Sequence, residues 1–581
     1  MTGETVTNDA VLSEPAKDAR PNLGLGKKMS RYWGEAVVVA LALLLWVPRL
    51  SGPIDLRWDA GVYYVLGTSL ASGHGYRILS EPGSPEALQY PPLLPALVAL
   101  HQRALGSTDA AIIGPWLRLS NAALFLFYAL AALALARRYL RAGFAVIAVA
   151  MSLLQVNTLF MSDLLFTELP FALVSVLFAL VAVDGRFASR PWIRETLSFV
   201  LAAAGFLLRT AGVALLIAWV LESLVRRQWR LALTRCLLVL LPVLAWQAHV
   251  MRVRGSYEYA HPAYEYQRAP YQFYNVSYAE NVGPAGSSHP DSLQARTGAF
   301  AWRLTTNLCR MGKRLGEGIS TSEGYWRDLL SNAQQLMFGR QVIRPSLVLV
   351  PIVVLSALVI AGIGILIHRR IWLLAFILLV SIGLICTTPW PDQFQRYLMP
   401  LTPFLAIAAL LALLGMRDAL RVWPLRRATR TVGHLVIAGL LLLPLILQIY
   451  TASAIFYVRQ REGASFVPGR GATGPRLFYY DRLWHGWEQA VAWVMRHSAP
   501  DAIVATPACH LCYLRSGRHA VAPPKEQDRA GILRLLESVP VSFVIVDRGY
   551  SLPPFDGDAP GWRLVQSFDG TRLYEHTGRP Q

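Results

Sequence analysis

Blocks of about twenty apolar residues, the length that a helix needs to cross a bilayer core, set the fold of this chain. The first block covers about 32–50. Ten more follow at about 115–135, 144–160, 167–183, 196–208, 211–225, 232–250, 346–367, 371–388, 397–416 and 432–455. A soluble core has no need of such blocks, so the sequence predicts a mainly α, polytopic transmembrane protein with about eleven spans.

Charge supports this prediction and orients it. The 581 residues are 54% hydrophobic and 16% charged, against roughly 25% charged in soluble domains. Much of the net charge of +19 comes from arginine clusters between the apolar blocks, near 137–141, 186–194, 226–235, 368–370 and 417–430. Basic loops of this kind lie in the cytoplasm. No basic stripe with interleaved aromatics occurs in a soluble segment, which argues against nucleic acid as a partner.

The same rule divides the chain into domains. Residues 1–31 form a polar, disordered cytoplasmic tail, and 32–456 form the transmembrane domain with external segments at 51–114 and 252–345. No cleavage pattern follows the first block, so it is expected to remain as a span. Alternating helical and β-branched patterns, such as the strand 541–546, predict an extracytoplasmic α/β domain over 457–581.

Two external stretches leave alternatives open. The apolar stretch 90–105 is short and polar near its end, so we interpret it as an interfacial helix; a true span there would invert everything downstream. The tyrosine-rich start of the 252–345 loop suits either an interfacial belt or a carbohydrate-stacking surface. Cys509 and Cys512 could form a local disulfide or stay as two free thiols.

Few ionisable residues fall on the predicted outer side. Asp59 follows the first span, Asp163 and Glu168 precede the fourth, and Arg209 and Arg396 lie at helix ends in apolar surroundings. Acids and guanidinium groups at one membrane face suit a site for a lipid-linked anion and a reacting hydroxyl.

The order of several short motifs resembles the membrane glycosyltransferases of the GT-C fold. After the external Asp59 come Gln89-Tyr90-Pro91-Pro92 and Thr167-Glu168-Leu169-Pro170-Phe171. Arg209-Thr210-Ala211-Gly212 and Gln395-Arg396-Tyr397-Leu398-Met399-Pro400-Leu401 follow. The protein O-mannosyltransferase and lipid A aminoarabinose transferase branches are the most similar in layout.

The resemblance implies a site. Asp59 would act as general base on the acceptor, although an acid there could instead cap the following helix. Arg209 and Arg396 would stabilise the leaving phosphate, with snorkelling at a helix end as the alternative. Tyr63, Tyr90 and His261 complete the substrate-binding set. Glu168 and Asp163 are candidate ligands for a divalent cation such as Mg or Mn, or interfacial residues without that role.

The resemblance also implies an activity. We expect transfer of a hexose or pentose from a polyprenyl-phosphate donor to an extracytoplasmic glycan, lipid or protein, in a bacterial cytoplasmic membrane. A transporter, flippase or ligase of lipid-linked glycans is the alternative. In the aminoarabinose transferase branch an acid and a lysine precede the first proline of the second motif, where this chain has Gln89 and Tyr90. The donor and acceptor of that branch should therefore not be carried over.

Overall fold

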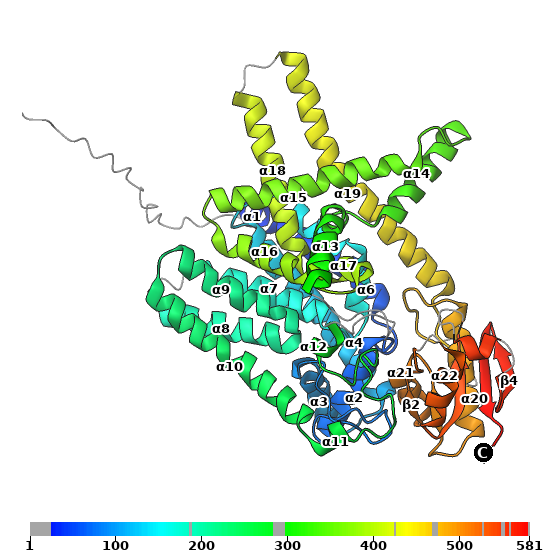
Figure 1. Ribbon diagram of the computed structural model, residues 1–581. Coiled ribbons are helices and arrows are strands. Elements are labelled where there is room, and N and C mark those ends of the chain that lie inside the picture. Colours follow the sequence, from blue (N-terminus) through cyan, green and yellow to red (C-terminus); the bar gives the residue numbers. More distant parts are fainter. Residues whose placement is uncertain are drawn as a thin grey trace, which may run out of the picture.

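The computed structural model describes residues 25–184, 189–282, 297–422, 426–466, 474–525, 528–547, 552–556 and 559–578. It consists of a large helical bundle and, at one end of it, a small domain built on a β-sheet (Figure 1). This arrangement confirms the predicted fold class.

The bundle contains the helices that follow the predicted spans. These are α1 (Leu25–Trp46), α4 (Ala110–Ala136), α5 (Ala142–Leu153), α6 (Val156–Asp163), α7 (Glu168–Ala182), α8 (Pro191–Leu208), α9 (Val213–Val225), α10 (Trp229–Arg254), α15 (Leu349–His368), α16 (Trp372–Cys386), α17 (Phe394–Leu398), α18 (Thr402–Val422) and α19 (Arg427–Glu462). Short 3₁₀ turns adjoin them at η1 (Val47–Arg49), η3 (Thr210–Gly212), η4 (Pro345–Val348), η5 (Pro391–Gln393) and η6 (Met399–Leu401).

In the described part of the chain, seven helices are long and apolar enough to cross a membrane, and the bent pair α5 and α6 brings the number to eight if the pair is one broken span and not a re-entrant loop. Four shorter apolar helices accompany them, of which α7, α9 and α16 match predicted spans. The span predicted at 144–160 is not straight. It bends by 57°, because Gln155 caps a new helix by accepting a hydrogen bond from the Thr158 amide.

The fourth short helix is α3 (Leu93–Leu105), the stretch interpreted as interfacial. Its 13 residues span about 20 Å, well short of a bilayer core of roughly 30 Å. It packs against α2 (Asp59–Ala71), where Gly67 leaves room for the Val98 side chain. Helix α9 has the same number of residues, so length does not separate the two and the interfacial position of α3 stays a prediction.

Helix α18 forms the centre of the bundle. The apolar segment that includes it is 89% buried, against 17% for α19 at the periphery. Helix α15 packs closely on α18, since a side chain at Gly362 would overlap the Ala408 carbonyl oxygen.

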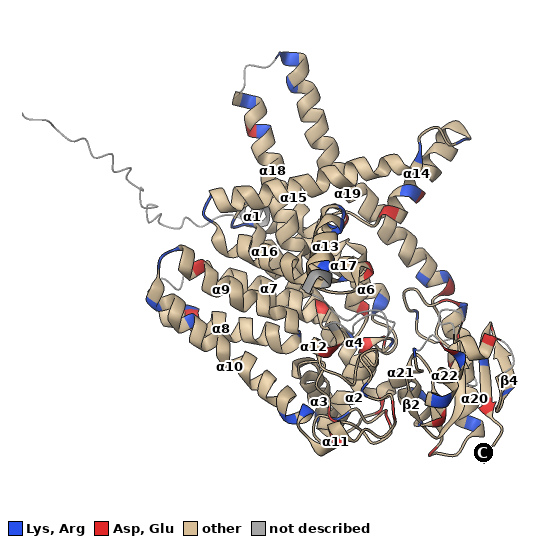
Figure 2. Cartoon of the chain, in the orientation of Figure 1, with Lys and Arg blue, Asp and Glu red and all other residues tan. Residues whose placement is uncertain are grey.

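Helix α19 connects the two ends of the molecule. Its 36 residues measure about 54 Å, much longer than a bilayer core is thick. Basic residues gather at the tip where α18 ends and α19 begins, and at the turn joining α9 to α10 (Figure 2). The small domain lies at the other end of α19 (Figure 1).

The small domain holds a five-stranded sheet in the order β2-β1-β3-β5-β4. The strands are β1 (Ile503–Ala505), β2 (His519–Val521), β3 (Val541–Val546), β4 (Trp562–Phe568) and β5 (Thr571–His576). β1 runs parallel to β2 and β3, whereas β5 is antiparallel to β3 and β4. Its helices are α20 (Arg482–His497), α21 (Cys509–Ser516) and α22 (Arg529–Glu537), with a 3₁₀ turn η7 (Pro553–Asp556).

The long loop between α10 and α15 packs on this domain with its first part and on the bundle with its later helices. It carries α11 (Tyr257–Ala260), α12 (Tyr278–Val282), α13 (Thr297–Gly318) and α14 (Glu323–Phe338). Tyr264 and Tyr266 are buried in one apolar cluster with strands β1, β2 and β3. These two tyrosines therefore pack in a protein core and do not belong to an exposed belt, whereas Tyr257 is exposed.

Candidate functional site

Asp59 is the first residue of α2, directly after a strained backbone position. Trp58 has φ 53° and ψ −133°, in the left-handed region that non-glycine residues rarely occupy. Its indole packs edge-on against Phe160 at 5.6 Å and Trp484 at 5.5 Å between ring centroids. These contacts hold the backbone in a conformation that fixes where Asp59 points.

The Asp59 carboxylate is held on both oxygens. Arg396 donates from Nη2 to Oδ2 at 2.7 Å, and the Tyr274 hydroxyl donates to Oδ1 at 3.0 Å. The N-cap residue of α2 is Trp58, without a side-chain capping bond, so Asp59 does not act as the cap. Its carboxylate lies between a cation on one side and a phenol on the other.

Glu168 brings the two predicted arginines together. Its side chain is fully buried and accepts a hydrogen bond from Arg396 Nε at 2.5 Å. Arg209 Nη1 forms an ion pair with the same carboxylate oxygen at 2.7 Å. Arg209 also lies over the Tyr397 ring at 5.0 Å, and Arg396 over Phe166 at 4.4 Å. The four predicted residues Asp59, Glu168, Arg209 and Arg396 thus form one charge-balanced cluster.

Both arginines keep capacity for another ligand. A guanidinium has five N–H donors. Among the described residues, the only acceptors that the N–H groups of Arg396 contact are the Asp59 and Glu168 carboxylates, and the only one that Arg209 contacts is Glu168. The remaining N–H groups can bind the oxygens of a phosphate, in the bidentate geometry that guanidinium groups favour.

The predicted tyrosines line the same cluster. The rings of Tyr63 and Tyr90 lie 4.8 Å apart, and Tyr90 lies 6.1 Å from Tyr274. Burial, and then the charge of Asp59, raises the pKa of Tyr63 well above its usual value. Both effects also raise the pKa of Tyr90, whose buried hydroxyl makes no hydrogen bond to the described residues. These phenols stay neutral and can donate to a substrate oxygen.

Asp163 lies in a different cluster. Its carboxylate is 3.8 Å from Arg49 Nη1, and Arg49 is flanked by two further buried arginines. Arg118 donates to the Arg49 carbonyl, while Arg459 donates to the Pro48 carbonyl and shares the Phe478 ring with Arg49. Asp163 therefore balances buried arginine charge and does not join Asp59.

This placement does not fit the predicted metal site. Glu168 faces two guanidinium groups and Asp163 belongs to a separate cluster, so the two acids do not converge on one cation. Among the described residues, no group of three or more His, Cys, Asp or Glu side chains could hold a metal ion. Any cation beside Glu168 would be repelled by Arg209 and Arg396.

His261 also lies apart from the cluster. It is exposed, its ring stacks on Tyr257 at 3.9 Å, and Nδ1 contacts the Tyr257 carbonyl.

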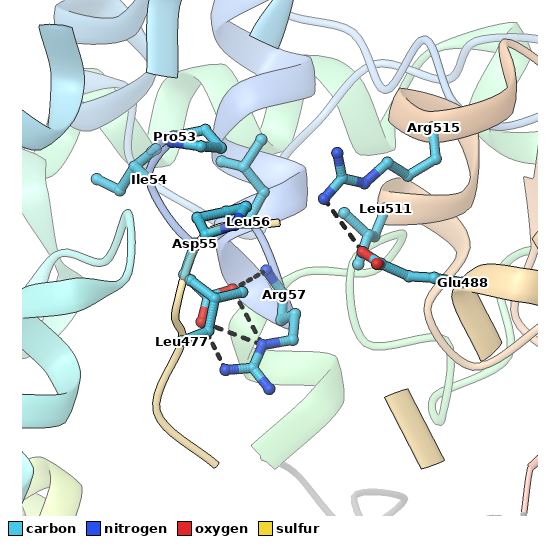
Figure 3. A pocket seen from close by; sticks show the side chains of 10 residues that line it. Pro53, Ile54, Asp55, Leu56, Arg57, Leu477, Glu488, Leu511 and Arg515 are labelled. Atoms are coloured by element: carbon cyan, nitrogen blue, oxygen red, sulfur yellow. Dashed lines mark hydrogen bonds and ion pairs between the residues drawn. The ribbon is translucent and has the colours of Figure 1, made fainter. Parts of the chain in front are cut away.

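A small cavity marks the seam between the first external segment and the small domain (Figure 3). Arg57 binds Asp55 through both carboxylate oxygens, and its guanidinium also donates to the Phe478 and Tyr479 carbonyls. Across the cavity, Arg515 pairs with Glu488. Arg57, held by Asp55, thus joins the two parts. Cys509 and Cys512, on the nearby α21, are both buried and free.

Sequence reasoning missed two residues at the cluster, Tyr274 and His510. Tyr274 belongs to the aromatic-rich loop, where many similar residues obscured it. His510 lies between the two cysteines, which drew attention to a disulfide instead. No spacing signal connects either residue to Asp59, more than two hundred positions earlier.

The bundle, its short additional helices and the charged cluster at one end define a polytopic membrane protein with the GT-C fold. Among solved structures, apo ArnT from Cupriavidus metallidurans is similar with a TM-score of 0.51 and 12% identity, over 95% of this chain and all of ArnT. The oligosaccharyltransferase of Archaeoglobus fulgidus, in complex with Zn and sulfate, gives 0.50 and 13%, over 88% of this chain and 67% of its own. No family model matches the sequence, and no curated protein matches it. The likeness shows the fold and explains the resemblance noted in the motifs.

Proposed function

We propose that this protein transfers a sugar from a polyprenyl-phosphate donor to a hydroxyl-bearing acceptor outside the membrane. The observation that carries the proposal is the Asp59 carboxylate, bound on one oxygen by Arg396 and on the other by Tyr274. A base for the acceptor and cations for a leaving phosphate thus lie side by side. The fold is that of solved enzymes of this kind, an oligosaccharyltransferase among them.

The reaction divides between the two sides of Asp59. Asp59 takes the proton of the acceptor hydroxyl while the acceptor oxygen bonds to the anomeric carbon. The bond from that carbon to the phosphate oxygen breaks, and its electron pair leaves with the polyprenyl phosphate. The free N–H groups of Arg209 and Arg396 stabilise this charge, and Glu168 holds both arginines in place.

The topology supports a lipid-linked donor. The arginine clusters favour a cytoplasmic position for the α18–α19 tip, and α19 is long enough for the small domain to lie on the other side. An extracytoplasmic site has no supply of cytosolic sugar nucleotides, whereas a polyprenyl donor arrives through the bilayer. We therefore assign the protein to a bacterial cytoplasmic membrane, with its N-terminus inside and residues 457–581 outside.

The test compares wild type with Asp59→Asn in membranes supplied with polyprenyl-phosphate sugars, and measures sugar transfer to endogenous acceptors. Loss of the base should lower the rate about 10²- to 10⁴-fold. Asp109→Asn is the matched control, since Asp109 is an exposed N-cap in the same external segment and asparagine caps equally well. It should transfer at the wild-type rate.

Three outcomes would replace the proposal. Full activity in Asp59→Asn would remove Asp59 from the mechanism. Movement of an intact lipid-linked glycan across the membrane, without cleavage of the sugar–phosphate bond, would make the protein a transporter or flippase. Transfer of whole glycans but not single sugars would make it a ligase.

A further inference from the structure

The small domain reaches the first turn of α2 through helix α21. A side chain at Gly61 would come within 3.1 Å of His510 Cβ and 3.3 Å of the Leu511 amide nitrogen. Gly61 lies two residues after Asp59, so the start of α21 packs directly on the turn that carries the proposed base. A contact this close makes the small domain part of the wall of the site.

His510 is the residue of α21 that contacts the residues around Asp59. It is 3% exposed, and its Nδ1 lies 2.7 Å from the Ser80 hydroxyl oxygen. Its ring packs edge-on against Tyr274, with centroids 4.5 Å apart and planes at 75°. Tyr274 in turn donates its hydroxyl to Asp59 at 3.0 Å. Ser80, His510, Tyr274 and Asp59 thus form one continuous row of contacts.

A histidine at this buried position is energetically unfavourable. Its second ring nitrogen, Nε2, is buried and makes no hydrogen bond to the described residues, and a buried polar atom without a partner destabilises the fold. Leucine would fill a purely apolar contact without that loss. The Ser80 contact provides the reason for a histidine, because it fixes the angle of the ring that meets Tyr274.

The imidazole does not act through charge. Burial lowers the pKa of His510 to about 3, although the nearby charge of Asp59 opposes this shift. The ring is therefore neutral at the pH of the cell exterior. It contacts Tyr274 as an oriented, uncharged ring.

The two oxygens of Asp59 face different partners. Oδ2 faces Arg396, the side on which the proposed phosphate would lie, whereas Oδ1 faces Tyr274. An acceptor hydroxyl approaches a base away from the leaving group, hence from the side of Oδ1. Tyr274 and the residue that supports it therefore stand on the acceptor side.

We propose that His510 is a positioning residue of the transfer site: held by Ser80, it fixes the Tyr274 ring and so the hydrogen bond that orients Asp59 toward the acceptor. The small domain then completes the acceptor side of the site. This inference rests on the proposed function.

A double-mutant cycle in the full-length protein tests it. Tyr274→Phe removes only the hydroxyl and should lower kcat about 10- to 100-fold, as expected for a lost hydrogen bond to a charged group. His510→Leu should lower kcat by a similar or smaller factor, and the KM for the donor should stay within about twofold. If His510 acts through Tyr274, the double variant should be no slower than Tyr274→Phe alone.

His519→Leu is the matched control. His519 lies on β2 of the same domain, partly buried, with its ring near Tyr513 rather than the cluster. It should keep the wild-type kcat. Ser80→Ala should give a smaller loss than His510→Leu, because the ring remains but loses its anchor.

Three results separate the possible failures. Wild-type kcat in a folded His510→Leu variant overturns the inference, as do losses that multiply in the double variant. Absence of sugar transfer in the wild type instead overturns the proposed function. In that case the melting temperatures of the same variants are measured in detergent. Additive effects of His510→Leu and Tyr274→Phe on the melting temperature would still refute the coupling of the two residues.

Discussion

Replacing Glu168 by glutamine tests whether one buried carboxylate organises the cations of the site. The side chain is fully buried and contacts both Arg209 and Arg396. Arg396 keeps Asp59 at 2.7 Å after the change, so the loss falls on Arg209, which retains only the face of Tyr397. Breaking a buried ion pair costs about 3–5 kcal/mol, and the amide oxygen of glutamine recovers part of this.

A remaining cost of about 3 kcal/mol corresponds to roughly a 10²-fold loss of kcat, if it is the cost of keeping Arg209 in its active position. Donor binding, unlike kcat, should not be weakened by this substitution. The four-residue cluster changes from neutral to a net positive charge, so a phosphate should bind at least as tightly and the KM for the donor should not rise. The assay is initial-rate transfer in membranes at varied donor concentration, with melting of the purified protein in parallel.

The matched control is Glu81→Gln. Glu81 is equally buried, but its partners are the neutral donors Tyr264, Asn275 and Gln267, and burial raises its pKa. Loss of its charge should leave the transfer rate within about threefold. The reasoning about Glu168 is refuted if both variants behave alike, or if Glu168→Gln raises the KM for the donor without lowering kcat.

Three further predictions follow from the same contacts. Asp163→Asn removes the carboxylate beside Arg49 and should lower the free energy of unfolding by about 3 kcal/mol in a melting experiment. The transfer rate per folded molecule should not change. A fall in kcat that added Mg or Mn restores would instead favour the metal role. Treatment with EDTA should leave transfer unchanged, since Glu168 faces two guanidinium groups, and dependence of the rate on a re-added cation would contradict this. Acidification should destabilise the fold through His510, because its pKa is lowered to about 3 from roughly 6.5 in an unfolded chain. The contribution of His510 to stability is complete above about pH 6.5. It falls between about pH 6.5 and pH 3 by at most about 1.4 kcal/mol per pH unit. His510→Leu should show a flatter melting profile over that range, and identical profiles would count against the assignment.

Much of the fold could be predicted because a membrane-spanning helix can be recognised from its own stretch of sequence. An apolar block of sufficient length has few other stable structures, and arginine clusters mark its ends. The bend between α5 and α6 escaped prediction because a single capping residue, Gln155, decides it within a continuous apolar run. The β4–β5 hairpin was missed because β4 exposes much of its length and its residues alternate weakly.

The sequence by itself determined the class of protein, the ends of most spans and four residues of the cluster: Asp59, Glu168, Arg209 and Arg396. These are charged side chains in apolar surroundings, and such residues are conspicuous because their burial is costly without a partner. Tertiary structure alone decided which charges become partners. It separated Asp163 from Glu168, left His261 at the surface, and brought Tyr274 and His510 to Asp59. Contacts between segments hundreds of residues apart depend on how helices pack in three dimensions, and no local pattern records that packing.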